Sequence, residues 1–342
     1  MAAYDTPKFV VPVSLDQILQ GIGKSIEELK SILGGKIRRE VPMPRDIFVE
    51  PTNTSDTSEH KLTARAQCAN PRVRQEWDSY SASDRRAFTD AIRCLMTRPR
   101  SGAFAAAKTR YEDMVALHQT RTPSVHGNHI FLLWHRYYLW TFEQLLRSEC
   151  GFNRQLPWFD ETRYSGRFAQ SSVFSSDNFG SVDIGGQCVT NGQFANLAIN
   201  IGPGTGNTRH CLARNGNSQL TANTNSQIVN GCNAYGIYST MAYCAERGAH
   251  AYGHNGVGAV MIDTYASPAD PVFWLHHAFI DRNFRVWQNS AASRRTSVDG
   301  TDTNGNKLTL DTVINVAGIR PDVRIRDILD TQETTLCYRY NY

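Results

Sequence analysis

The chain has 342 residues, of which 41% are hydrophobic and 20% charged, an ordinary globular composition that allows one large domain or two modest ones. Its 36 basic and 32 acidic residues give a net charge of +4 and are mixed along the chain, which argues against nucleic-acid or membrane-surface partners. No apolar run approaches the roughly 20 residues of a membrane-spanning helix.

The first 65 residues are expected to form an extension that packs on the core. Short helices are predicted over residues 14–20 and 25–33, because each segment begins at a serine suited to cap a helix. The polar stretch 51–61 that follows is predicted to be an irregular strap. It holds Asn53, which belongs to the only Asn-X-Ser/Thr sequon of the chain.

Helical periodicity is clear in three segments of the first half. Residues 81–96 begin with a Ser81 cap and Asp84 three positions later, and Pro99 lies just beyond their end. Residues 131–146 have the pattern of a strongly amphipathic helix. A third helix is predicted over residues 108–118, where four side chains share one face: Tyr111, Met114, Val115 and His118.

Residues 165–235 are rich in Gly, Asn, Ser and Thr and have little periodicity, which predicts long irregular loops. Cys188, Cys211 and Cys232 lie in this region and are natural staples for it. The eight cysteines of the chain include no CxxC pair, which argues against a zinc ribbon or a thioredoxin-like site. Their even number predicts up to four disulfides, with a pairing that cannot be deduced. Disulfides indicate secretion, although the sequence begins without a hydrophobic signal core.

Two further helices are predicted, over residues 241–254 and 270–288. In the second, Asp270 suits the N-cap and Pro271 the first helical position. No repeat at a solenoid period is present. We therefore predict a single mainly α domain over residues 66–342, with four or five core helices joined by long loops.

Helical geometry selects the histidines that can meet at one metal ion. His250 and His254 are four residues apart and share a helical face, but the residues between them lack the glutamate of zinc peptidases. His276 and His277 are neighbours that point about 100° apart, so only one of them is expected to face a shared site. We prefer the second, which lies on one stripe with Phe273 and other large apolar side chains.

The stretch HGNHIFLLWHRYYLW, residues 126–140, holds three more histidines. His126 and His135 are nine residues apart and would lie on opposite sides of a continuous helix. They can converge if His126 lies in a loop before the helix, for which Pro123 and Gly127 are suitable. His129 would point about 180° away from His135 and is not expected to be a ligand.

This selection leaves six of the ten histidines, in two groups of three. Two groups of neutral imidazoles suit copper better than calcium, magnesium or a thiolate-bound zinc. Any one of the six alone would more often be a hydrogen-bonded core histidine. Six of them on inward helical faces are too many for coincidence and favour a metal site. We predict that these six, His118, His126, His135, His250, His254 and His277, hold copper.

At these residues the sequence resembles the tyrosinase and polyphenol oxidase family, whose members hold a coupled pair of type 3 copper ions. HGNHIFLLWHRYYLWTFEQLL is similar to the copper A signature of the family, and HAYGH and DPVFWLHHAFIDR are similar to the copper B signature. The resemblance implies two copper ions, copper A held by His118, His126 and His135, and copper B held by His250, His254 and His277. The resemblance begins at about Val73 and runs to the end. ECGFNRQLPWFDETRYSGRF and LCYRY resemble the short secreted fungal branch, which includes catechol oxidases.

The resemblance implies a central antiparallel four-helix bundle around the dicopper site, dioxygen as co-substrate, and small phenols as substrates. A monomer or weak dimer is expected. Ser124 stands where many fungal members have a cysteine bonded to the second copper A ligand, so that bond cannot form here. Tyr338 and Tyr340 fit the family's YxY motif, and because the sequence stops at Tyr342 no C-terminal lid domain is expected.

The resemblance also suggests roles around the copper ions. Glu246 is expected to hold a water near the site, although a solvated helix glutamate is an equal alternative. Many relatives place an asparagine directly after the first copper B histidine, where this chain has Ala251. By position, the residues expected to contact substrate or line its path are Ala251, Asn255, which could line the entrance, Thr264 over copper A, and Phe273 against the copper B imidazoles.

The missing asparagine favours oxidation of o-diphenols to o-quinones with weak or slow hydroxylation of monophenols, because a phenol has a pKa near 10 and needs a positioned proton acceptor. The alternatives are a full tyrosinase with efficient monophenol hydroxylation, and an oxygen carrier such as the hemocyanins, which use similar six-histidine sites. A disulfide-stapled binding domain without metal is a third possibility.

Overall fold

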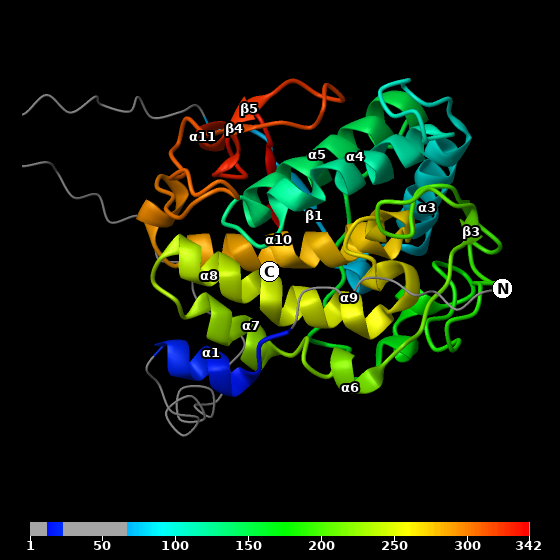
Figure 1. Cartoon of the computed structure of the whole chain (residues 1–342), viewed down its shortest axis with the longest axis horizontal. Coiled ribbons are helices and arrows are strands. Elements are labelled where there is room, and N and C mark those ends of the chain that lie inside the picture. Colours follow the sequence, from blue (N-terminus) through cyan, green and yellow to red (C-terminus); the bar gives the residue numbers. More distant parts are fainter. Residues whose placement is uncertain (1–11, 23–66, 342) are drawn as a thin grey trace, which may run out of the picture.

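The computed structural model describes residues 12–22 and 67–341, and their regular structure is mainly helical (Figure 1), which confirms the predicted fold class. The longer helices are α1 (Leu15–Ile22), α3 (Ala82–Thr97), α4 (Arg110–Val125), α5 (Phe131–Cys150), α7 (Ser226–Asn233), α8 (Tyr238–Ala245), α9 (Ala251–Val257) and α10 (Val272–Asn289). A π-helical stretch, η4 (Glu246–His250), joins α8 to α9. Shorter helical turns are η1 (Trp77–Ser79), η2 (Phe168–Gln170), η3 (Ser172–Phe174), α6 (Ser218–Thr221), η5 (Ala259–Ile262), η6 (Ser267–Ala269), η7 (Ala292–Arg295) and α11 (Ile325–Ile328).

The strands of the described residues are short and form three separate pairs. β1 (Arg72–Arg74) lies parallel to β6 (Tyr338–Tyr340), so the two ends of the described domain meet there. The other pairs are antiparallel and belong to loops: β2 (Ala198–Ile199) with β3 (His210–Cys211), and β4 (Val313–Ile314) with β5 (Val323–Arg324).

Two helices begin where the sequence predicts. Ser14 Oγ accepts a hydrogen bond from the backbone N–H of Gln17 at 3.2 Å, and Ser81 Oγ accepts one from Asp84 N–H at 3.1 Å. α1 packs against α7 (Figure 1), so this part of the N-terminal extension does contact the core. The predicted helix over residues 25–33 and the strap over residues 51–61 lie outside the described residues.

All eight cysteines form disulfides, as predicted, and the region 165–235 is largely irregular. Cys188–Cys211 lies within that region, whereas Cys232–Cys244 ties α7 to α8. The short helices α6 and α7 were not predicted there, because their sequences are dominated by polar residues. The remaining disulfides are Cys68–Cys337 and Cys94–Cys150.

The predicted loop at Pro123 is wrong, because α4 continues to Val125 and includes this proline in its last turn. A proline removes one backbone hydrogen bond and crowds the preceding turn, which normally ends a helix. Here the buried side chains of Thr122 and Val125 flank it and hold the turn against the core. The chain leaves the helix only at His126, whose backbone is extended.

The helix predicted over residues 241–254 is divided into α8, η4 and α9. Gly248 has φ −87° and ψ −121°, outside the helical region. A Cβ at this residue would lie 3.2 Å from both Cys232 Sγ and Ile228 Cγ2, so the close approach of α7 leaves little room for a side chain here. Such π-helical interruptions are frequent at functional sites.

The start of α10 also differs from the prediction by one residue. Pro271 occupies the N-cap position and the helix begins at Val272. Asp270 nevertheless caps the helix, because its Oδ1 accepts from Val272 N–H at 3.0 Å. Its two carboxylate oxygens also accept from Arg214 at 2.7 and 2.8 Å, which fixes the entry to α10 in the core.

A buried network ties α5 to α10. Arg136 Nε on α5 donates to Asp281 Oδ1 on α10 at 2.6 Å, and both side chains are almost fully buried. The hydroxyls of Tyr338 and Tyr340 both donate to Asp281 Oδ2 at 2.6 Å. The C-terminal strand therefore holds together two helices that each carry a predicted copper ligand.

None of the helices in the described residues is long and apolar enough to span a membrane.

Candidate metal centre

The three histidines predicted for copper A converge. His118 lies on α4, His126 directly follows that helix, and His135 lies on α5. One ligand nitrogen of each lies within 4.8 Å of those of the other two. His126 reaches the group because α4 ends at this residue. His129 is not in the group, as predicted, and its Nδ1 accepts from Thr301 N–H at 2.8 Å.

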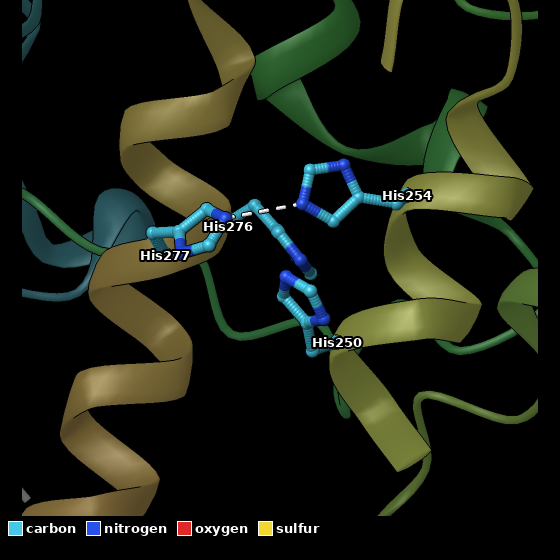
Figure 2. Close-up of side chains that lie close together, drawn as sticks. All are labelled: His250, His254, His276 and His277. Carbon is cyan, nitrogen blue, oxygen red and sulfur yellow. Dashed lines mark hydrogen bonds between the residues drawn. The ribbon is translucent and has the colours of Figure 1, made fainter. Parts of the chain in front are cut away.

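The copper B group contains four histidines rather than three. Figure 2 shows that His250 and His254 project from η4 and α9 toward His276 and His277 on α10. The ligand atoms of all four lie within 4.8 Å of one another, and all four side chains are buried. Both neighbours therefore lie close to the group, although only one of them was expected to face a shared site.

Backbone carbonyls fix the tautomer of most of these rings. A carbonyl oxygen can only accept, so an imidazole Nδ1 that faces one carries the hydrogen, and Nε2 keeps its lone pair. Five of the predicted ligands have this arrangement, at 2.6–3.4 Å: His118 with Tyr265 O, His126 with Thr122 O, His135 with Phe131 O, His250 with Glu246 O, and His254 with Met261 O.

The Nε2 atoms approach one another in pairs, and His118 and His135 turn the lone pairs fixed in this way toward each other, which fits a metal ion. His118 Nε2 lies 3.4 Å from His135 Nε2, and His254 Nε2 lies 3.1 Å from His277 Nε2. Burial lowers the pKa of His118 to about 4 and the pKa of His135 well below its usual range, so these two rings are neutral at neutral pH. Two nitrogens that each bind a metal ion at about 2.0–2.1 Å have separations of this order.

The two groups lie next to each other. The rings of His135 and His277 stack at 4.6 Å between centroids, and those of His126 and His250 are 6.4 Å apart. Two ions held by these groups would therefore be close neighbours, which fits a dicopper site rather than two independent metal sites.

Two phenylalanines pack between the groups in matching ways. Phe131 is four residues before His135, and its ring centroid lies 4.7 Å from that ring and 4.6 Å from His250 in the other group. Phe273 is four residues before His277, stacks on it at 4.0 Å, and lies 5.4 Å from His118. Each ring thus contacts histidines of both groups and excludes water between them. The predicted contact of Phe273 with the copper B imidazoles is present.

Glu246 is buried and links the two groups. Its Oε1 accepts from Gly127 N–H, next to His126, at 2.8 Å, and its backbone carbonyl accepts from His250 Nδ1. Burial raises the pKa of its carboxyl to about 7, although the Gly127 N–H and Arg247 act in the opposite direction. The alternative of a solvated surface glutamate is therefore excluded.

Of the remaining predicted residues, two lie on α9 and the third in the loop between η5 and η6. Ala251 is fully buried directly after His250. Asn255 is partly buried on α9, and its Oδ1 has no hydrogen-bond partner among the described residues. Thr264 is partly exposed, and its carbonyl accepts from Thr122 Oγ1 at 3.3 Å, which places it beside α4.

Sequence reasoning missed a buried carboxylate behind His276. Glu161 Oε1 accepts from His276 Nδ1 at 2.6 Å. A Cβ on Gly253 would lie 2.4 Å from His276 Cε1, so this ring occupies the space that a glycine leaves on α9. Nothing in the periodicity of residues 156–170 indicates that Glu161 is buried. Phe131 could have been found, because it stands four residues before a histidine as Phe273 does.

Comparisons with known proteins agree with this geometry. The family model for the common central domain of tyrosinase matches residues 108–290, more than half of the chain. Tyrosinase ustQ of Aspergillus flavus is 33% identical over 292 residues, which cover 80% of each protein. Tyrosinase P of Aspergillus terreus is 28% identical over 338 residues, 82% of this chain and 94% of the relative.

A solved structure has the same fold. A polyphenol oxidase variant from Thermothelomyces thermophila superposes with a TM-score of 0.72 and 23% identity, covering 97% of this chain and 99% of that one. Two histidine groups that fit a pair of copper ions, the family model and the fungal relatives agree, and this chain therefore belongs to the tyrosinase family of type 3 copper oxidoreductases.

Proposed function

We propose that this protein oxidises o-diphenols to o-quinones with dioxygen and hydroxylates monophenols weakly or slowly. The observation that carries the proposal is Ala251, whose methyl group is buried directly after His250 and offers no hydrogen-bonding atom. In this reaction, two o-diphenols and one dioxygen give two o-quinones and two waters.

The proposed ligands are His118, His126 and His135 for copper A and His250, His254 and His277 for copper B. His277 is preferred to His276 because its Nε2 faces His254 Nε2 and its ring stacks on His135 of the other group. His276 instead holds Glu161. When bound, the copper pair supplies the transfer of electrons from the phenol to dioxygen. The protein keeps the imidazoles neutral, orients them and excludes water from around them.

Proton removal distinguishes the two reactions. A monophenol must lose its hydroxyl proton as it docks, and at neutral pH this requires a positioned acceptor, such as a held water. Glu246 can offer one carboxylate oxygen to such a water while the other accepts from Gly127 N–H. Ala251 cannot provide the second hydrogen bond that would fix the water. The hydroxyl proton of a monophenol is therefore removed inefficiently. A catechol is more acidic and is easier to oxidise, and it depends less on this acceptor.

The outer part of the substrate path is proposed to include Thr264 and Asn255. A position of Thr264 near copper A is supported by the next residue, Tyr265, whose carbonyl accepts from His118 Nδ1. Asn255 follows His254 and has an unused Oδ1 with which to contact a polar substituent. Phe273 provides the apolar wall against which an aromatic ring can pack.

We also propose that the protein is secreted and acts as a monomer or weak dimer, with residues 66–342 as the catalytic domain. Four disulfides support an oxidising compartment, since such bonds are rare in reducing ones.

Paired initial rates on a monophenol and on its catechol, measured with copper-loaded protein, test the proposal. We expect rapid quinone formation from the catechol, and a slow reaction with a lag from the monophenol. Equal rates on both substrates would contradict it, and copper-loaded protein that binds dioxygen without turnover would indicate an oxygen carrier.

A further inference from the structure

We propose that Asp263 is a positioning residue for both copper ions. The loop between α9 and α10 supplies one carbonyl to a histidine of each group. Met261 O accepts from His254 Nδ1 at 2.6 Å, and Tyr265 O accepts from His118 Nδ1 at 2.9 Å. Asp263 lies midway between these two residues. The conformation of one short loop therefore orients a ligand of copper A and a ligand of copper B together.

The side chain of Asp263 determines the shape of that loop. It is fully buried, and its Oδ1 accepts from Tyr265 N–H at 2.9 Å and from Ala266 N–H at 3.2 Å. Its own backbone N–H donates to Val260 O at 3.2 Å, and its carbonyl accepts from Ser267 N–H at 2.9 Å. The hydrogen bond from Ala266 N–H holds the peptide plane that contains the Tyr265 carbonyl, so the carboxylate controls the direction of the carbonyl that orients His118.

The second carboxylate oxygen anchors the loop to a distant segment. Asp263 Oδ2 accepts from Gly204 N–H at 2.8 Å. A Cβ on Gly202 would lie 2.7 Å from Ala266 Cβ and 3.3 Å from Asp263 Oδ2, so the two segments are in close contact. Three backbone N–H groups converge on two oxygens that must both accept, which a carboxylate satisfies and an amide does not.

Loss of this carboxylate should therefore weaken both metal positions at once. Replacing Asp263 by Asn turns one acceptor into a donor that opposes a backbone N–H, and the loop must move to relieve this. Loss of a group that orients a metal ligand typically lowers metal affinity about 10- to 100-fold. The inference depends only on the dicopper site and not on which phenols react, so a failure of the proposed substrate preference leaves it untouched.

The experiment compares Asp263→Asn with Asp330→Asn, which replaces a similarly buried carboxylate held by Arg285 and Gln332 N–H. Copper per chain is measured after dialysis against a graded series of chelator concentrations, and copper-free stability is measured by thermal unfolding. We expect Asp263→Asn to fall from two copper ions to none at chelator concentrations about 10- to 100-fold below those that strip the wild type. Asp330→Asn should lose copper at the same chelator concentrations as the wild type, even if its unfolding temperature falls as much as that of Asp263→Asn.

Gly202→Ala provides a second route to the same loop, because its new methyl group would press on Ala266 and on the carboxylate. Gly202→Ala should also release both copper ions at lower chelator concentrations than the wild type. If Asp263→Asn does not fold, Gly202→Ala alone tests the proposal. The proposal is overturned if the folded variants bind both ions as the wild type does. It is equally overturned if they lose only one ion, or if Asp330→Asn loses copper to the same extent at equal stability.

Discussion

The rings of His135 and His277 stack at 4.6 Å between centroids with 17° between their planes, the shortest ring contact between the two histidine groups in the described residues. His135 lies on α5 and His277 on α10, and the buried bond from Arg136 to Asp281 joins the same two helices. The packing of α5 against α10 therefore determines how close these two rings lie.

Ligand identity in the copper B group can be tested by exchanging each neighbour for asparagine. We expect His277→Asn to hold one copper ion per chain, because the nitrogen that faces His254 is lost. His276→Asn is the matched control and should hold two, since an amide can still donate to Glu161. Copper analysis measures both, and the lone cupric ion of His277→Asn should become visible by electron paramagnetic resonance. The reverse pattern would make His276 the ligand.

The substrate preference should respond to a hydrogen-bonding group at residue 251. Ala251→Asn should raise the ratio of the monophenol rate to the catechol rate by about tenfold or more, a part of the 10²–10⁴ that a positioned proton acceptor contributes. Ala251→Val adds comparable bulk without a polar atom and should leave the ratio low. Glu246→Gln should lower it further. An increase with valine as large as with asparagine would show that space, not hydrogen bonding, decides the preference.

Local spacing predicted much of the metal centre. Histidines four residues apart lie on one helical face, so the meeting of His250 and His254 follows from local geometry, whereas that geometry did not predict that His276 would join His277 in the group. The same reasoning failed where long-range packing decides. Gly248 interrupts a helix where α7 packs closely against it, and nothing within residues 241–254 reveals that contact.

Residues that orient the ligands through their backbone could not be predicted from the sequence either. Met261 and Tyr265 act through their carbonyl oxygens, for which any side chain would serve. Asp263 looks like an ordinary loop aspartate until Gly204, which is far away in the chain, is seen to donate to it. Glu161 is recognised only when α10 brings His276 to it.

The four disulfides should differ in their effect on the copper site. Removing Cys188–Cys211 or Cys232–Cys244 by paired serine substitutions should lower the free energy of unfolding by about 2–4 kcal/mol in each case. Only the second packs against Gly248, in the stretch that carries Glu246 and His250. We therefore expect copper to be released more readily from that variant alone. Equal copper retention at equal stability would contradict this role for the Cys232–Cys244 bridge.

The buried carboxylate of Asp281 should make stability depend on acid pH. Burial alone would raise its pKa, but the guanidinium groups of Arg136 and Arg74 and the hydroxyls of Tyr338 and Tyr340 together hold the pKa below its ordinary value. A carboxyl whose pKa is lower in the folded than in the unfolded protein binds fewer protons there. Its stabilisation is therefore complete above the unfolded pKa of about 4 and is lost as the pH falls through the folded pKa.

Asp281→Asn isolates this contribution. At pH 7 the variant should unfold with a free energy about 3–5 kcal/mol lower than the wild type, because the buried Arg136 loses its counter-charge. Below about pH 4 the difference should shrink, since a protonated Asp281 also lacks a charge. Both proteins are compared without copper, by denaturant unfolding between pH 3 and pH 7, so that protonation of the copper ligands affects them equally. A difference that stays constant across this range would mean that Asp281 stabilises α5 and α10 by packing and neutral hydrogen bonds, not by its charge.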